Sequence, residues 1–179
     1  VVIFEKMPIV GGNTSKSSAG MNASETKFQK EAGIEDSNDK FYEETFKGGK
    51  EKNDPELLRF LVDHSASAID WLDSMNIKLD NLTTTGGMSV KRTHRPSDGS
   101  AVGGYLVEGL YANVTERKIP TFVNSDVTEI TEENGAVSGV KVTVEGQEKT
   151  IKSKAVVLAT GGFGANLDMV SQLKPELKG

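Results

Sequence analysis

Two short apolar runs constrain the fold of this chain more than any other feature. One is Val1–Phe4, and the other is Ala155–Ala159, which ends at the turn Thr160-Gly161-Gly162. Apolar runs without polar alternation are typical of strands buried on both faces of a parallel sheet. Helical patterns follow the first run, and strand patterns precede the second. The sequence therefore predicts an α/β fold built on a doubly wound parallel sheet.

Helical patterns occupy much of the first 120 residues. We expect four helices, over 23–32, 37–47, 53–76 and 102–117. The third is the clearest, because Asp54 is a capping residue type and Pro55 suits the first helical position. Its apolar residues recur at three- and four-residue steps and are expected to face the core: Leu58, Leu61, Val62, Ile69, Leu72 and Met75. Trp71 is also expected in the core, whereas His64 is expected at the surface.

From Thr121 onward the apolar period changes from helical spacing to two. This period predicts three short strands, over 127–130, 136–144 and 149–152. Asn134-Gly135 is a strong hairpin signal, because both residue types tolerate positive φ. We therefore expect a three-stranded antiparallel β-meander, over about 121–154, as the crossover that returns to the parallel sheet.

Composition excludes several classes of function. The net charge is −5 and the 21 Lys and Arg residues are scattered, whereas a nucleic-acid surface needs clustered cations. No apolar run approaches the roughly 18 residues that a membrane span requires. Cysteine is absent and only two histidines occur, so we expect no disulfide, no thiol chemistry and no metal site.

Glu5 stands at the end of the first apolar run. In dinucleotide-binding folds, an acidic residue at such a strand end accepts hydrogen bonds from ribose hydroxyls and follows a GxGxxG turn by about 20 residues. Taken alone, Glu5 is more simply explained as an ordinary charge at a strand end. If the ribose reading holds, the first strand and its GxGxxG turn precede Val1, and the chain is a partial domain.

A glycine- and serine-rich stretch, 10–22, follows Glu5 and Lys6. Backbone amides at Gly11 and Gly12 can approach a nucleotide closely, and Asn13 is a candidate donor to phosphate oxygens. The small residues over 17–22 leave room for a flat ring system. The alternative is a flexible surface loop, but an acidic strand end followed closely by Gly-Gly favours a nucleotide site.

At this point the sequence resembles a known family, the soluble fumarate reductases and fumarate-reducing flavocytochromes. The wider family includes succinate dehydrogenase flavoprotein subunits, aspartate oxidase, urocanate reductase and ketosteroid dehydrogenases. The resemblance covers nearly the whole chain and rests on Val2–Lys6, Gly11–Asn13, Ala19–Ala23, Lys47–Gly49, Asn53–Pro55, Ile69–Trp71, Gly86–Gly87, Ser89–Pro96 and Ala159–Phe163. It implies a Rossmann-like FAD-binding domain and an oxidoreductase that reduces fumarate to succinate by hydride transfer from reduced FAD.

The resemblance also implies where FAD binds. The implied contacts are Glu5, Lys6, Gly11, Gly12 and Asn13 around the ribose, Ser18, Ala19 and Gly20 along the pyrophosphate and isoalloxazine, Val127 at the adenine through its backbone, and Thr160 and Gly161 closing over the cofactor. Respiratory succinate dehydrogenases carry a flavin-linking His in the loop that here reads Ser15-Lys16-Ser17-Ser18. No His stands there, so FAD is expected to bind noncovalently.

Arg92, His94 and Arg95 form the densest cationic group beside a glycine loop. They either hold a dicarboxylate or the flavin edge, or they pin a loop through backbone carbonyls. The family's proton-donating Arg and substrate-binding residues belong to a capping domain expected after Gly179, so no catalytic residue is assigned within the chain.

Three expectations remain open at this stage. Urocanate, aspartate or a 3-ketosteroid is the alternative substrate. The isolated chain is expected to be catalytically silent and to bind FAD weakly or not at all. The electron donor is not indicated, and a cytoplasmic location is only slightly favoured.

Overall fold

The computed structural model describes residues 1–178, which divide into two compact units. The first unit contains residues 1–13 and the segment from Thr121 onward, and the second contains residues 14–120. Each unit has its own sheets and is described separately below. The mixture of one parallel and two antiparallel sheets with six α-helices among the described residues confirms the predicted α/β class.

The first unit holds the parallel strand pair. Strand β1 (Ile3–Phe4) pairs in parallel with β5 (Thr121–Phe122), and the Phe4 and Phe122 rings stack with centroids 5.7 Å apart. The backbone of Glu5 prolongs this pairing, because its N–H donates to Phe122 O and its carbonyl accepts from Ser125 N, both at 2.9 Å. A parallel strand is thus present near the start of the chain, but it is shorter than the predicted Val1–Phe4. Val1 and Val2 are exposed, so the expected burial of the whole run is wrong.

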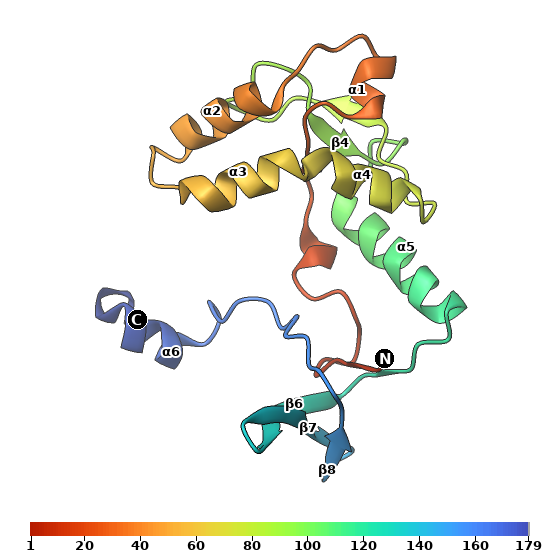
Figure 1. Ribbon diagram of the computed structural model, residues 1–179, viewed down its shortest axis with the longest axis vertical. Helices are drawn as coiled ribbons and strands as arrows, with labels where there is room; N and C mark the ends of the chain where they lie inside the picture. The colour runs from red at the N-terminus through yellow and green to blue at the C-terminus, as the bar shows by residue number, and fades with distance from the viewer. Residues whose placement is uncertain (179) are drawn as a thin grey trace. The chain divides into compact units, whose positions relative to one another are not determined.

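The predicted β-meander is also confirmed. Strands β6 (Ser125–Glu133), β7 (Ala136–Val144) and β8 (Gln147–Lys152) form an antiparallel sheet in that order (Figure 1). Asn134 and Gly135 have φ of 54° and 78°, as a tight hairpin turn requires. Val140 and Val142 on the central strand are buried.

The prediction of a buried strand over Ala155–Ala159 is wrong. These residues have no regular structure, and the Val157 and Leu158 side chains are 88% and 70% exposed. An apolar run shows that a segment can be buried, but a strand also needs a neighbour to complete its hydrogen bonds, and no strand within residues 1–178 pairs with it. Helix α6 (Leu167–Leu173) and the 3₁₀ turn η2 (Pro175–Leu177) follow and were not predicted.

The second unit carries five helices and a 3₁₀ turn. The 3₁₀ turn is η1 (Thr14–Lys16). The helices are α1 (Lys27–Glu31), α2 (Asn38–Gly48), α3 (Pro55–Asp63), α4 (Ser65–Asp73) and α5 (Val102–Glu116). Asp54 caps α3 as expected, because its Oδ1 accepts from the amides of Glu56 and Leu57 at 3.0 Å.

Two predicted helices differ from the observed ones. The helix expected over 53–76 is divided at His64, where ψ is 1°, and the Ser65 hydroxyl donates to the Val62 carbonyl at 2.8 Å. Serine hydroxyls compete for helix carbonyls in this way. The helix expected from residue 23 starts only at Lys27, because Thr26 and Gln29 form a capping box.

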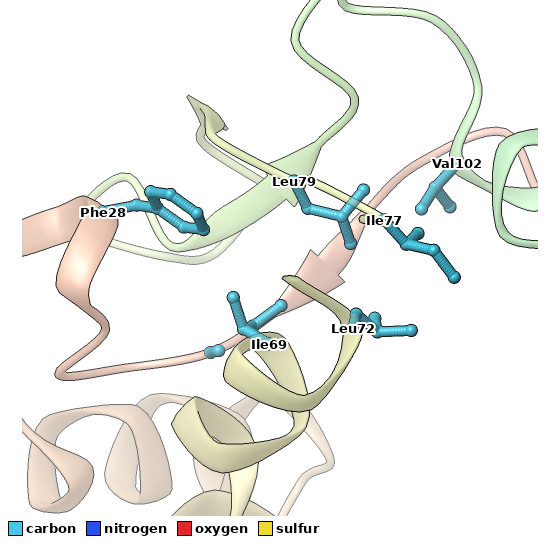
Figure 2. Packing of buried hydrophobic residues seen from close by; sticks show 7 residues of the cluster. Phe28, Ile69, Leu72, Ile77, Leu79 and Val102 are labelled. Atoms are coloured by element: carbon cyan, nitrogen blue, oxygen red, sulfur yellow. The ribbon is translucent and has the colours of Figure 1, made fainter. Parts of the chain in front are cut away.

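The core of the second unit lies between α4, α5 and the segment that follows α4. Figure 2 shows its buried side chains, which include Phe28, Ile69, Leu72, Ile77, Leu79 and Val102. Trp71 is not among them, because it is 57% exposed, and Leu61 is 55% exposed, so both core predictions are wrong. Trp71 lies two residues from Ile69 and therefore on another side of α4.

A three-stranded antiparallel sheet completes this unit. Its order is β2 (Met21–Asn22), β4 (Thr93–Arg95) and β3 (Asn81–Thr83), and β4 is the central strand. The sequence patterns predicted neither β2 nor β4 as a strand. Strands of two or three residues show no readable alternation, so pairing between distant segments defines them.

Candidate cofactor-binding site

The strand end at Glu5 is held by its own backbone and side chain. The Glu5 Oε1 atom accepts a hydrogen bond from the Met7 amide at 2.8 Å, which turns the chain sharply after β1. The other carboxylate oxygen makes no hydrogen bond within residues 1–178, and the residue is half-buried. Glu5 is therefore oriented by the turn and retains an acceptor for a ligand hydroxyl.

The Gly-Gly turn adopts backbone that favours glycine. Gly11 and Gly12 have φ of 110° and 47°, and a side chain at Gly12 would meet no atom within 4 Å. Asn13, the last residue of this part of the first unit, is exposed. The conformation thus requires glycine for its dihedral angles and leaves space beside the backbone for another molecule.

Lys6 and the second glycine turn line one hollow. This open hollow of about 850 Å³ is bordered by Lys6, by Thr160, Gly161 and Gly162, and by the start of α6. Gly161 has φ of 71° with open space around it. Lys6 and the pair Thr160-Gly161 lie far apart in the sequence, and all three were predicted to contact the cofactor. The structure therefore brings them together at one hollow.

The stretch Ser18–Gly20 belongs to the second unit, and Gly20 packs against β4. A Cβ at Gly20 would lie 2.4 Å from the His94 carbonyl oxygen and 2.9 Å from side-chain atoms of Thr93 and Arg95. Ser18 and Ala19 are exposed. Glycine at position 20 is thus needed for the backbone to lie directly on β4.

The start of α5 contacts the residues just before this stretch. The Gly103 amide donates to the Ser17 carbonyl at 3.0 Å, and a Cβ at Gly103 would lie 2.1 Å from the Thr14 carbonyl oxygen. The loop from η1 to β2 is therefore fixed by close backbone contacts rather than being a flexible surface loop.

Val127 lies where the β6–β7 pairing is irregular. Val127 pairs with Val142 but Glu129 pairs with Lys141, so a β-bulge falls at Thr128. A bulge leaves backbone groups outside the ladder. This irregularity is consistent with a backbone contact at Val127, which the resemblance implied.

Arg92 is a buried structural cation. Its guanidinium is fully buried and donates to Asp36 through Nε at 2.9 Å and Nη2 at 2.6 Å, and to Glu44 through Nη1 at 2.7 Å. It also lies over the Phe41 ring, 4.9 Å from the centroid. Because these partners occupy its donors, the geometry supports a structural role for Arg92 over contact with a ligand. The guanidinium acts through carboxylates, however, and not through the backbone carbonyls that were expected from the sequence.

His94 is likewise buried and fully used. Its Nδ1 lies 2.8 Å from the Arg92 carbonyl, which can only accept, so Nδ1 carries the hydrogen. Its Nε2 then accepts from the Thr26 hydroxyl at 2.8 Å. Burial lowers the pKa of His94, so the ring is held neutral.

Arg95 is the member of this group with donor capacity left. Its Nη2 donates to the Ser100 carbonyl at 3.2 Å, and its Nε is buried without a hydrogen-bond partner within residues 1–178. His94 and Arg95 belong to β4, and Arg92 directly precedes it. Their side chains bind different partners, so the three residues do not form a single cationic cluster.

Within residues 1–178, no group of His, Cys, Asp and Glu side chains is arranged to hold a metal ion. The same residues include no helix long and apolar enough to cross a membrane.

Comparison with known proteins places these features in a family. The FAD binding domain family matches residues 1–179 in full. The chain belongs to this FAD-binding family. Its cofactor is therefore FAD, and the glycine turns with open space, the cationic Lys6 and the oriented Glu5 carboxylate fit a dinucleotide's phosphates and ribose.

Several relatives of the chain are named as fumarate-reducing enzymes. The chain is 52% identical over 180 residues to the NADH:fumarate oxidoreductase of Klebsiella pneumoniae, covering all of this chain and 20% of that protein. It is 40% identical to the fumarate reductase (cytochrome) of Shewanella frigidimarina, covering all of this chain and 32% of that protein. The chain thus spans between a fifth and a third of these relatives, which are oxidoreductases.

The fold agrees with these sequence relationships. The open conformation of a flavocytochrome c3 fumarate reductase superimposes with a TM-score of 0.91 at 38% identity, covering 99% of this chain and 32% of that one. The predicted α/β class and fumarate reductase resemblance are therefore confirmed.

Proposed function

We propose that the protein to which this chain belongs is a flavin-dependent reductase that converts fumarate to succinate. The observation that carries the proposal is that the whole of this chain matches part of fumarate-reducing relatives, one of them at 52% identity. In this proposal, bound FAD supplies the hydride that reduces the carbon–carbon double bond. The proposal also includes a partial domain, with a GxGxxG strand before residue 1, a substrate cap after residue 179, and the meander as crossover.

Within this proposal the chain's residues bind and orient the cofactor. Glu5, Lys6, Gly11, Gly12 and Asn13 hold the ribose and its phosphates, and Val127 contacts adenine through its backbone. Thr160 and Gly161 close over the same cofactor from the hollow that they share with Lys6.

The flavin ring is proposed to lie along Ser18, Ala19 and Gly20. Binding is noncovalent, because the loop Ser15–Ser18 contains no histidine. Lys6 supplies a positive charge beside the phosphates, while the oriented Glu5 carboxylate accepts from ribose hydroxyls. The groups that bind fumarate and deliver the proton lie outside the chain.

Steady-state turnover of the full-length protein tests the substrate. Reduced methyl viologen serves as electron donor, and its oxidation is followed with fumarate, urocanate, iminoaspartate or a 3-ketosteroid at equal concentrations. We expect fumarate to give the highest kcat/KM by at least tenfold, with succinate as product. Faster turnover of any of the other three acceptors would contradict the substrate assignment while leaving FAD binding intact.

A further inference from the structure

The small sheet of the second unit has one apolar and one polar face. Paired residues form two rows across the three strands. One row consists of Met21, His94 and Leu82, and the other consists of Asn22, Thr93 and Thr83. Neighbouring residues of a strand point to opposite faces. Met21 and Leu82 pack against the hydrophobic core, so the row containing Asn22 faces the other way.

A chain of hydrogen bonds fixes the Asn22 side chain within that polar row. The Thr93 hydroxyl donates to Asn22 Oδ1 at 2.6 Å. Because a hydroxyl has one hydrogen, the Thr85 hydroxyl must donate to Thr93 in their mutual hydrogen bond. The carbonyl of Thr93 in turn accepts from Thr83 Oγ1 at 3.4 Å.

This arrangement determines which part of Asn22 is available. With Oδ1 engaged by Thr93, the amide presents Nδ2 elsewhere, and this atom makes no hydrogen bond within residues 1–178. The side chain is half-buried. Asn22 is therefore an oriented neutral donor without an acceptor among the described residues, which is an arrangement expected for a ligand contact.

The position of Asn22 identifies the ligand group. Asn22 follows Gly20 by two residues, and Gly20 lies directly on β4, the strand that holds Asn22 through Thr93. We propose that Asn22 Nδ2 donates a hydrogen bond to an electron-rich atom of the FAD isoalloxazine, a ring nitrogen or a carbonyl oxygen. This inference rests on the proposed placement of the flavin along Ser18–Gly20.

Such a donor stabilises the reduced flavin more than the oxidised one. Reduction adds negative charge to the ring, and a preoriented N–H stabilises that charge. Asn22 thus raises the cofactor's reduction potential, and Thr93 and Thr85 act as positioning residues through it.

The reduction potential of bound FAD tests the proposal in the full-length protein. N22D keeps the shape and an acceptor for Thr93 but replaces the donor with a negative charge, and N22L removes both polar groups. T93V removes the hydroxyl that orients the amide. The matched control is T84V, because Thr84 is an exposed neighbour outside the polar row.

We expect N22D to lose more than tenfold of the preference for reduced over oxidised FAD, which lowers the two-electron potential by more than about 30 mV. N22L and T93V should lower the potential less, in that order, and T84V should leave it unchanged. A loss of flavin from N22D also supports the proposal if the N22D and wild-type apoproteins unfold at the same temperature, because a repelled cofactor dissociates.

Equal potentials in wild type, N22D and N22L would overturn the inference. So would equal shifts in N22D and T84V, because a purely structural role has no dependence on charge. If N22D unfolds, T93V decides the question in the same way. A wild-type protein that binds FAD and reduces fumarate while these variants keep its potential refutes this inference alone, whereas a wild type without FAD refutes the proposed function as well.

Discussion

Arg92 and Asp36 form a two-point ion pair in which both side chains are fully excluded from solvent. This pair joins the segment before β4 to the loop before α2, and Glu44 of α2 adds a second acceptor at 2.7 Å. Buried charges are tolerated only when they are paired, so removing one partner leaves the other uncompensated.

R92M and D36N should each destabilise the protein by about 3–5 kcal/mol, as breaking a buried pair usually does. Urea denaturation measures this change. The matched control is R59M, because Arg59 pairs with Asp39 and Asp63 at the surface and its loss should cost about 1 kcal/mol or less. Similar losses in R92M and R59M would show that the buried network is not structural.

His94 predicts a pH dependence of stability. Burial lowers its pKa in the folded protein below the ordinary 6.5, so the unfolded chain takes up the proton first as pH falls. The stabilisation is complete above pH about 6.5 and is lost progressively below it. Urea midpoints at pH 7.5, 6.5 and 5.5 measure the effect.

The two histidines provide a matched comparison for this measurement. H94Q should flatten the loss of stability between pH 6.5 and 5.5, whereas H64Q should keep it, because His64 is exposed. A wild-type midpoint that is constant across this window would contradict the account of His94.

G20A should damage the flavin loop. Its Cβ would lie 2.4 Å from the His94 carbonyl oxygen, and backbone cannot move aside cheaply. We expect FAD affinity of the full-length protein to fall at least tenfold and stability to fall by about 1–3 kcal/mol, as overpacking usually costs. G48A is the control, since a Cβ there meets nothing within 4 Å and alanine favours helix. Equal FAD affinities in the two variants would refute the tight packing of Gly20 on β4.

K6M should weaken FAD binding by about tenfold, because Lys6 lies in the hollow with Thr160 and Gly161. The loss should shrink at high salt, which screens the phosphate attraction. Isothermal titration at two ionic strengths measures both effects. K149M, at an exposed position of β8, should bind FAD as wild type does. A K6M affinity equal to that of K149M would remove Lys6 from the site.

The sequence predicted those elements whose signal is local. The meander followed from its period of two and from Asn134-Gly135, and the cap of α3 followed from Asp54 and Pro55. It failed where structure depends on a distant partner. Ala155–Ala159 has the composition of a strand but no pairing partner among the described residues, and the sheet β2–β4–β3 consists of strands too short to show a pattern.

In the candidate site, too, local features could be predicted from the sequence and features that depend on distant residues could not. Glycines with positive φ and the strand-end Glu5 are visible in sequence, and the structure places Lys6, Thr160 and Gly161 on one hollow. The orientation of Asn22 was not predictable, because it depends on Thr93, which lies 71 residues away in the sequence. Arg92 and His94 were candidates to bind a ligand because of their residue type, whereas their burial gives them a structural role.

The flavin content of the purified full-length protein tests the central claim most directly. After saturation with FAD and gel filtration, we predict one FAD per chain, with the flavin released into the supernatant by acid precipitation because it is not covalently linked. A correctly folded full-length protein that emerges from the column without a flavin spectrum would contradict the account.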